Sequence, residues 1–211
     1  MGLGTQTGPR PDAGSGGLTR AGHSGLLVTF LFAALVIAAA IGYAPAYLNY
    51  SDPAVKADAV VLFLGSDNGA RHQEATRLIE SGFADRLIIP ASWKYMKENG
   101  IIQSPNKALT SYPRFYENTH IEVLEAKREM DLSGFRKAIF VSSPSHMRRI
   151  RIIATHVFGN PDKSGNLYEI AFVPARSEES PSFSWLLDIH HLEEMMLEYA
   201  KMAWFCLYKN T

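Results

Sequence analysis

The side chains best suited to chemistry lie in loops that each follow an apolar run. One of them, residues 142–149 (SSPSHMRR), combines hydroxyl groups, an imidazole and a guanidinium, carried by Ser143, Ser145, His146 and Arg149. An imidazole of ordinary pKa exchanges protons near neutral pH, and a guanidinium can fork onto two oxygens of an anion. His146 and Arg149 are three residues apart and would share one side of a helix. Spacing alone leaves structural and functional roles for both equally open.

A second loop, residues 65–71 (GSDNGAR), also stands between an apolar run and a predicted helix. Its candidate ligand-binding residues are Gly65, Ser66, Asp67, Asn68 and Arg71. Glycines allow close approach of the backbone, and the free N–H groups of a helix N-terminus suit phosphate or carboxylate. The spacing matches neither a dinucleotide-binding loop nor a P-loop. An Asp/Asn-rich helix cap is therefore the alternative interpretation.

A third candidate is the segment that opens the predicted helix 119–131. Asn118 or Thr119 would make a good N-cap, with Glu122 completing a capping box. Glu117 precedes it, and could act as a general acid or base or only complement the helix dipole. We count Asn118, Thr119 and Glu122 as candidate ligand-binding residues and Glu117, with His146, as candidate catalytic residues.

The composition excludes several classes of protein. The 211 residues carry 21 Lys and Arg against 21 Asp and Glu, so the balanced charge argues against a general nucleic-acid binder. A single cysteine excludes an intrachain disulfide and any Cys-x-x-Cys site. A paired His190-His191 with Glu193 and Glu194 has metal-ligand spacing, but on a long amphipathic helix we interpret it as a solvated face. We expect no metal site, and nothing in the sequence identifies a cofactor.

The elements that must position these loops alternate between strand and helix. Apolar runs predict strands at 57–64, 86–90, 137–141 and 168–173, and helical spacing predicts helices at 70–81, 119–131, 145–158 and 183–208. The last helix has an apolar stripe at Leu186, Ile189, Leu192, Met196, Tyr199, Ala203 and Cys206. Such alternation indicates an α/β fold with a parallel sheet flanked by helices. Ligands bind such sheets outside the carboxyl ends of the strands, where loops 65–71 and 142–149 would lie.

The N-terminal part of the chain is different in kind. We expect a disordered tail at 1–24, a transmembrane signal anchor at 25–48 that ends near Pro45, and one α/β domain at 49–211. Arg10 and Arg20 before the apolar run, against Lys56 after it, favour an N-terminus inside the cell. A cleaved signal peptide, with a site at residues 44–46, and a buried core helix are the alternatives.

Three segments taken together resemble the bacterial YdcF/SanA/ElyC family. They are ADAVVLFLGSDNGARHQEATRLIESGFADRLIIPAS, ENTHIEVLEAK and KAIFVSSPSHMRRIRIIATHVFG, and with Trp185 and residues 198–201 they cover roughly residues 57–205. The resemblance implies a Rossmann-like fold, an N-terminal membrane anchor and a role in the bacterial cell envelope. With the N-terminus inside, the anchor would lie in the inner membrane and the domain on the periplasmic or extracytoplasmic side. No general reaction is established for this family.

Two hypotheses about function follow. The first is an enzyme that acts on a phosphorylated small molecule or lipid-linked precursor, with Arg71 and Arg149 holding phosphate and His146 as general acid or base. The second is a ligand-binding or scaffold protein of the envelope without turnover. The anchor fits both hypotheses equally, and the position of His146 at the sheet edge favours the enzyme.

Overall fold

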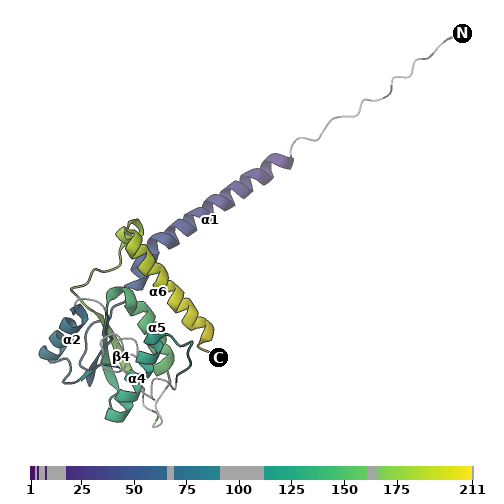
Figure 1. Ribbon diagram of the computed structural model, residues 1–211. Helices are drawn as coiled ribbons and strands as arrows, with labels where there is room; N and C mark the ends of the chain where they lie inside the picture. The colour runs from purple at the N-terminus through teal and green to yellow at the C-terminus, as the bar shows by residue number, and fades with distance from the viewer. Residues whose placement is uncertain are drawn as a thin grey trace. The chain divides into compact units, whose positions relative to one another are not determined.

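The computed structural model describes residues 1, 2, 4, 8, 18–65, 69–90, 112–160, 165 and 167–210, with the side chains of 18–25 left aside (Figure 1). The chain divides into two compact units, Met1–Ile41 and Gly42–Thr211. The predicted residues Ser66, Asp67 and Asn68 lie outside the described residues. The second unit holds the whole sheet.

Helix α1 (Leu18–Leu48) carries the apolar run. Its segment Leu26–Leu48 is long and apolar enough to cross a membrane, judged by length and composition. The helix begins before the predicted boundary at residue 25, and it continues through Pro45, which the sequence predicted to lie near its end. Proline removes one helical hydrogen bond, but tertiary contacts hold the last turn, since Tyr199 donates to the Ala44 carbonyl and Leu48 is fully buried.

Four parallel strands form one sheet in the order β2-β1-β3-β4, which confirms the predicted α/β class. They are β1 (Ala59–Leu62), β2 (Leu87–Ile88), β3 (Lys137–Ser142) and β4 (Glu169–Pro174). Strand β1 pairs with β2 on one side and with β3 on the other. The connections that leave β1 and β3 therefore diverge between two adjacent strands, the position where open α/β sheets bind ligands.

Helices cover both faces of the sheet (Figure 1). On one face Val60, Leu62 and Ile139 pack with Leu78 of α2 (Ala70–Glu80). On the other, Phe140 and its neighbours pack with α4 (Asn118–Ser133), α5 (Met147–Phe158) and the end of α6 (Ile189–Tyr208). The short 3-10 helices η2 (Pro144–His146) and η3 (Phe183–Leu187) precede α5 and α6. Successive strand side chains point to opposite faces and both faces are covered, so the buried centres of β1, β3 and β4 are apolar on both sides.

The predicted helix 183–208 is wrong in two respects. It is broken at Asp188, whose carboxylate accepts the backbone N–H groups of His190 and His191 and so starts a new helix there. The predicted apolar stripe is not the buried face, because Ile189 and Met196 are exposed. The face that packs on the domain carries Met195, Glu198, Met202, Phe205 and Tyr208. A glutamate in the middle of this face hid it from a hydrophobicity pattern.

The pH dependence of stability should report on His120, which is buried between Tyr116, Phe205 and Tyr208. Burial, aided by the charge of His156, lowers the pKa of His120 to about 4. The unfolded chain binds this proton near pH 6.5 and the folded chain near 4, so stability is lost as pH falls through that range, by on the order of 3 kcal/mol. Urea unfolding of His120→Gln should show a slope shallower by about one proton; an unchanged slope would contradict this assignment.

Candidate functional site

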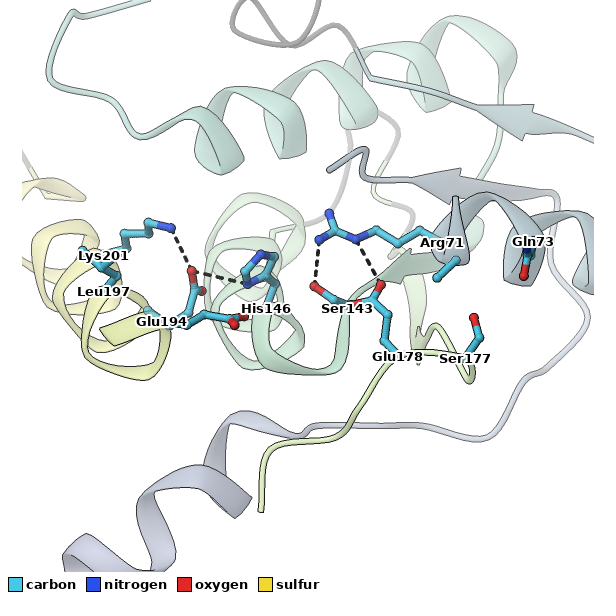
Figure 2. A pocket seen from close by; sticks show the side chains of 11 residues that line it. Arg71, Gln73, Ser143, His146, Ser177, Glu178, Glu194, Leu197 and Lys201 are labelled. Carbon is cyan, nitrogen blue, oxygen red and sulfur yellow. Dashed lines mark hydrogen bonds and ion pairs between the residues drawn. The ribbon is translucent and has the colours of Figure 1, made fainter. Parts of the chain in front are cut away.

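A pocket of about 690 Å³ opens at the carboxyl ends of β1, β3 and β4. Its polar wall is drawn from four separate segments of the chain and includes Arg71, Ser143, His146, Glu178, Glu194, Glu198 and Lys201. Figure 2 shows His146 between Arg71 and Glu178 on one side and Glu194 and Lys201 on the other. The two predicted loops thus meet in one pocket, together with side chains from α6.

Arg71 lies in the first turn of α2 and is buried, 6% exposed, beside the end of β1. Its guanidinium donates to the Ser143 hydroxyl (Nη2 to Oγ, 2.8 Å) and to the Phe63 carbonyl (Nη1 to O, 3.3 Å). Glu178 lies on the other side, with 3.5 Å between Oε1 and Nε. The two loops, predicted to lie at one sheet edge, are therefore joined by the Arg71–Ser143 hydrogen bond, and the guanidinium reaches the pocket with its charge partly balanced by Glu178.

Gly65 leaves the space that the Arg71 guanidinium occupies. A methyl group added at Gly65 would overlap that guanidinium, with 2.5 Å to its Cζ. Gly69, next to α2, has a φ of 86°, which favours glycine for a different reason, its left-handed backbone. Gly65 therefore matters to the site because a side chain at this position would displace the Arg71 guanidinium.

Gly65→Ala should displace Arg71 from Ser143 and weaken any anion binding that depends on Arg71, while the sheet stays folded. We expect a loss of stability of about 1–3 kcal/mol from overpacking. Gly82→Ala, at a turn away from the pocket with a φ of 73°, is the control for loss of a glycine. Anion titration of both variants checks this: binding by Gly65→Ala equal to that of Gly82→Ala would show that Arg71 tolerates the methyl group.

His146 lines the pocket with its side chain 23% exposed. Its Nδ1 lies 3.3 Å from Glu198 Oε1 and 3.4 Å from the Ser145 hydroxyl. Ser145 donates its own hydrogen to Glu194 (2.7 Å), so its oxygen can only accept from the imidazole. An ionised Glu198 can also only accept. Both neighbours therefore favour a proton on Nδ1, which leaves Nε2 with a lone pair.

The charge states of this pair follow from their surroundings. Burial lowers the pKa of His146; the charges of Arg149 and Arg71 act in the same direction, and Glu198 opposes them. Burial alone would raise the pKa of Glu198, but His146 and Arg149 bring it well below the usual range. At neutral pH the site therefore holds a neutral imidazole next to a carboxylate, the arrangement of a general base.

Arg149 does not line the pocket, contrary to its predicted role as a phosphate ligand. It is 4% exposed, and each of its three nitrogens donates to a protein group. Nε and Nη2 bind the two oxygens of Glu198 at 2.6 and 3.2 Å, and Nη1 binds Glu117 at 2.5 Å and the Thr119 hydroxyl. Arg149 is thus a positioning residue that fixes Glu198 behind His146.

The predicted capping box of α4 is absent. The N-cap is Glu117, without a side-chain cap, and the Thr119 hydroxyl serves Arg149 instead. Burial raises the pKa of Glu117 in spite of the Arg149 charge. Asn118 is exposed, while Glu122 is buried and acts on Arg149 by its charge. None of these residues lines the pocket, so the structure does not bring the third segment together with the other two loops except through Arg149.

The contribution of α6 to the pocket does not follow from the sequence pattern. The pattern places Glu194 on a solvated face, but Glu194 lines the pocket and accepts from Ser145. Glu198 is 1% exposed and also accepts from Lys201 at 2.8 Å. Spacing of Glu198 with Met195, Met202 and Phe205 was a signal that could have found it. Within the described residues, no cluster of His, Cys, Asp and Glu is placed to hold a metal ion.

Comparison of the chain with protein-family models, with curated proteins and with solved structures finds no match. The resemblance to the YdcF/SanA/ElyC family rests on the three sequence segments and stays a prediction. The geometry of the site places an arginine, a serine hydroxyl and a histidine paired with a carboxylate around one pocket.

Proposed function

We propose that this protein is a membrane-anchored enzyme of the bacterial cell envelope that binds a phosphorylated ligand in the pocket and acts on it by acid–base catalysis. The observation that carries the proposal is the pairing of His146 with Glu198 in the same pocket as the buried Arg71. A cation and a poised base at the carboxyl edge of a parallel sheet suit a ligand with both an anionic group and a reacting hydroxyl.

Arg71 and Ser143 would bind the phosphate. The Arg71 guanidinium is fixed by Ser143 and the Phe63 carbonyl, and the Glu178 carboxylate lies against its Nε. A phosphate oxygen that took the place of the Glu178 carboxylate would meet the same guanidinium and the Ser143 hydroxyl. Charge-assisted hydrogen bonds of this kind are about twice as strong as neutral ones, and the N-terminus of α2 adds a favourable dipole.

His146 would move the proton. With Nδ1–H directed to Glu198, its Nε2 can accept a proton from a water or sugar hydroxyl as that oxygen attacks the bound ligand. Glu198 then stabilises the imidazolium that forms. The proton returns from Nε2 to the oxygen of the departing group, so that the imidazole ends neutral. Lys201, which donates to Glu198, reaches the same pocket and can contact a second anionic group.

Helix α1 supports the proposed location. We propose that the apolar segment Leu26–Leu48 of α1 anchors the chain in the inner membrane, with the N-terminus inside and the α/β domain on the periplasmic or extracytoplasmic side. The lysine and arginine residues that flank the span favour this orientation, with Arg10 and Arg20 before it and Lys56 after it. A lipid-carrier phosphate or a nucleotide sugar fits such a position and such a pocket.

Thermal unfolding of the full chain in detergent, with and without ligand, tests phosphate binding. The probes are inorganic pyrophosphate, a uridine-diphosphate sugar and a polyprenyl phosphate. A ligand at 100 times its Kd stabilises by about 2.7 kcal/mol, and we expect Arg71→Met to lose most of that gain. Arg128→Met, an exposed arginine on α4, removes the same charge away from the pocket and should keep it. If no probe stabilises the wild type, or if Arg71→Met keeps the gain, the proposed phosphate site is wrong.

A further inference from the structure

Three large apolar side chains stand exposed where η3 leads into α6. Phe183, Leu187 and Ile189 are 63%, 82% and 70% exposed, in a segment whose Trp185 is buried and stacked on His191. Trp185 and the Asp188 cap fix this turn, so the exposed side chains are held outward on a rigid support. Rigid exposed apolar clusters on a folded domain mark contact surfaces. We call this cluster, Phe183, Leu187 and Ile189, the apolar tip.

The apolar tip adjoins the end of α1 within the folded unit Gly42–Thr211. The Phe183 ring lies 3.9 Å from where a Cβ at Gly42 would be, and Tyr43, one residue on, is 63% exposed. The last turns of α1 are fastened to the domain, because Tyr199 donates to the Ala44 carbonyl and Arg148 to the Tyr47 carbonyl. Figure 1 shows α6 beside this end of α1. Whatever surrounds Gly42 and Tyr43 therefore also surrounds the tip.

The length of the apolar part of α1 indicates that Gly42 and Tyr43 lie in the membrane. Of the apolar segment Leu26–Leu48, sixteen residues, 26–41, precede the folded unit, and at 1.5 Å per residue they span about 24 Å. A hydrocarbon core is about 30 Å thick, and the residues before Leu26 include the polar Ser24 and His23. The missing length of about 6 Å is one helical turn, Gly42–Pro45, which belongs to the folded unit.

We propose that the apolar tip is a membrane-contact surface that enters the interfacial layer of the bilayer beside the anchor. This inference rests on the proposed anchor. Drawing Gly42–Pro45 into the membrane carries Phe183, Leu187 and Ile189 with them, and Tyr43 lies at the depth that interfacial aromatic residues prefer. Amphipathic surfaces of this kind bury about 5–10 Å into the headgroup boundary. Glu194 lies five residues beyond Ile189 on α6, about 8 Å along its axis, so the pocket would open near the headgroup layer.

Site-directed fluorescence of the full chain in phosphatidylcholine–phosphatidylglycerol vesicles tests the contact. In a Cys206→Ser background, Leu187→Cys, Leu207→Cys and Ala34→Cys each receive an environment-sensitive dye. Leu207 is as exposed as the tip, at 73%, but about 27 Å away along α6, and Ala34 reports the anchor itself. We expect the dyes at Ala34 and Leu187 to be blue-shifted and quenched by nitroxide lipids, and the dye at Leu207 to behave as in water.

The outcomes separate the two proposals. Addition of Phe183→Ser and Ile189→Ser should return the Leu187 dye to water while the Ala34 dye stays in lipid. If the Ala34 dye is in lipid but the Leu187 dye matches that at Leu207, the anchor stands, the bilayer thins to fit the short helix, and the contact surface is overturned. If the Ala34 dye also lies in water, both the anchor and the surface fall. None of these fluorescence outcomes depends on ligand binding in the pocket.

Discussion

Arg149→Met should destabilise the protein by about 3–5 kcal/mol, because it removes the guanidinium that lies between two carboxylates, Glu117 and Glu198, although Lys201 still contacts Glu198. The side chains of Glu198 and Arg149 are 1% and 5% exposed, and Glu117 binds the same guanidinium. With Arg149 gone, Glu198 and Glu117 repel one another inside the domain. Chemical unfolding of the full chain in detergent measures the loss. Arg148→Met is the matched control, since the neighbouring Arg148 lies over the rings of Tyr47 and Tyr50 and donates to the Tyr47 carbonyl.

The double variant Arg149→Met/Glu198→Met tests whether the loss of stability comes from an uncompensated buried charge or from lost packing. Replacing both partners of a buried pair by apolar side chains of similar volume is often nearly neutral, so the double variant should be more stable than Arg149→Met. A single variant as stable as wild type that nevertheless fails to bind the phosphorylated probe would contradict the positioning role. It would restore Arg149 as a ligand residue, as the sequence first suggested.

His146→Gln should lower turnover of the phosphorylated ligand about 10²- to 10⁴-fold, the usual contribution of a general acid or base. Ligand affinity should change little, because Arg71 and Ser143 carry the phosphate. The wild-type rate should rise with pH through a pKa below 6.5, since burial lowers the pKa of His146 and only the neutral ring accepts a proton. The variant should lose this limb of the pH profile.

The control for this prediction is a histidine outside the pocket. His156→Gln changes an exposed histidine near the far end of α5, the helix whose N-cap is His146, and should leave turnover as it is. A folded His146→Gln protein that binds ligand and turns it over within twofold of wild type would end the catalytic hypothesis. The pocket would then be a binding site alone, as in the non-catalytic envelope protein that the sequence also allowed.

Local sequence was sufficient for most of the fold. The apolar runs before loops 65–71 and 142–149 predicted β1 and β3, and the alternation with helices predicted a parallel sheet. Each of these inferences depends on neighbours in the chain, such as the period of a helix or a run of residues buried on both faces. The same reasoning failed for α6, where Glu198 occupies the buried face and Ile189 the exposed one.

Sequence alone determined that Arg71, Ser143 and His146 would meet, because parallel strands bring their carboxyl ends to one sheet edge whatever the packing around them. Tertiary structure alone decided what each does. Arg149 and Glu198 are 49 residues apart, and their pairing depends on how α6 docks against α5. Because of that contact, Arg149 is a buried partner of Glu198 rather than the predicted phosphate ligand, and Glu198 lies next to His146. Charge roles depend on distance and burial, and both are properties of the folded chain.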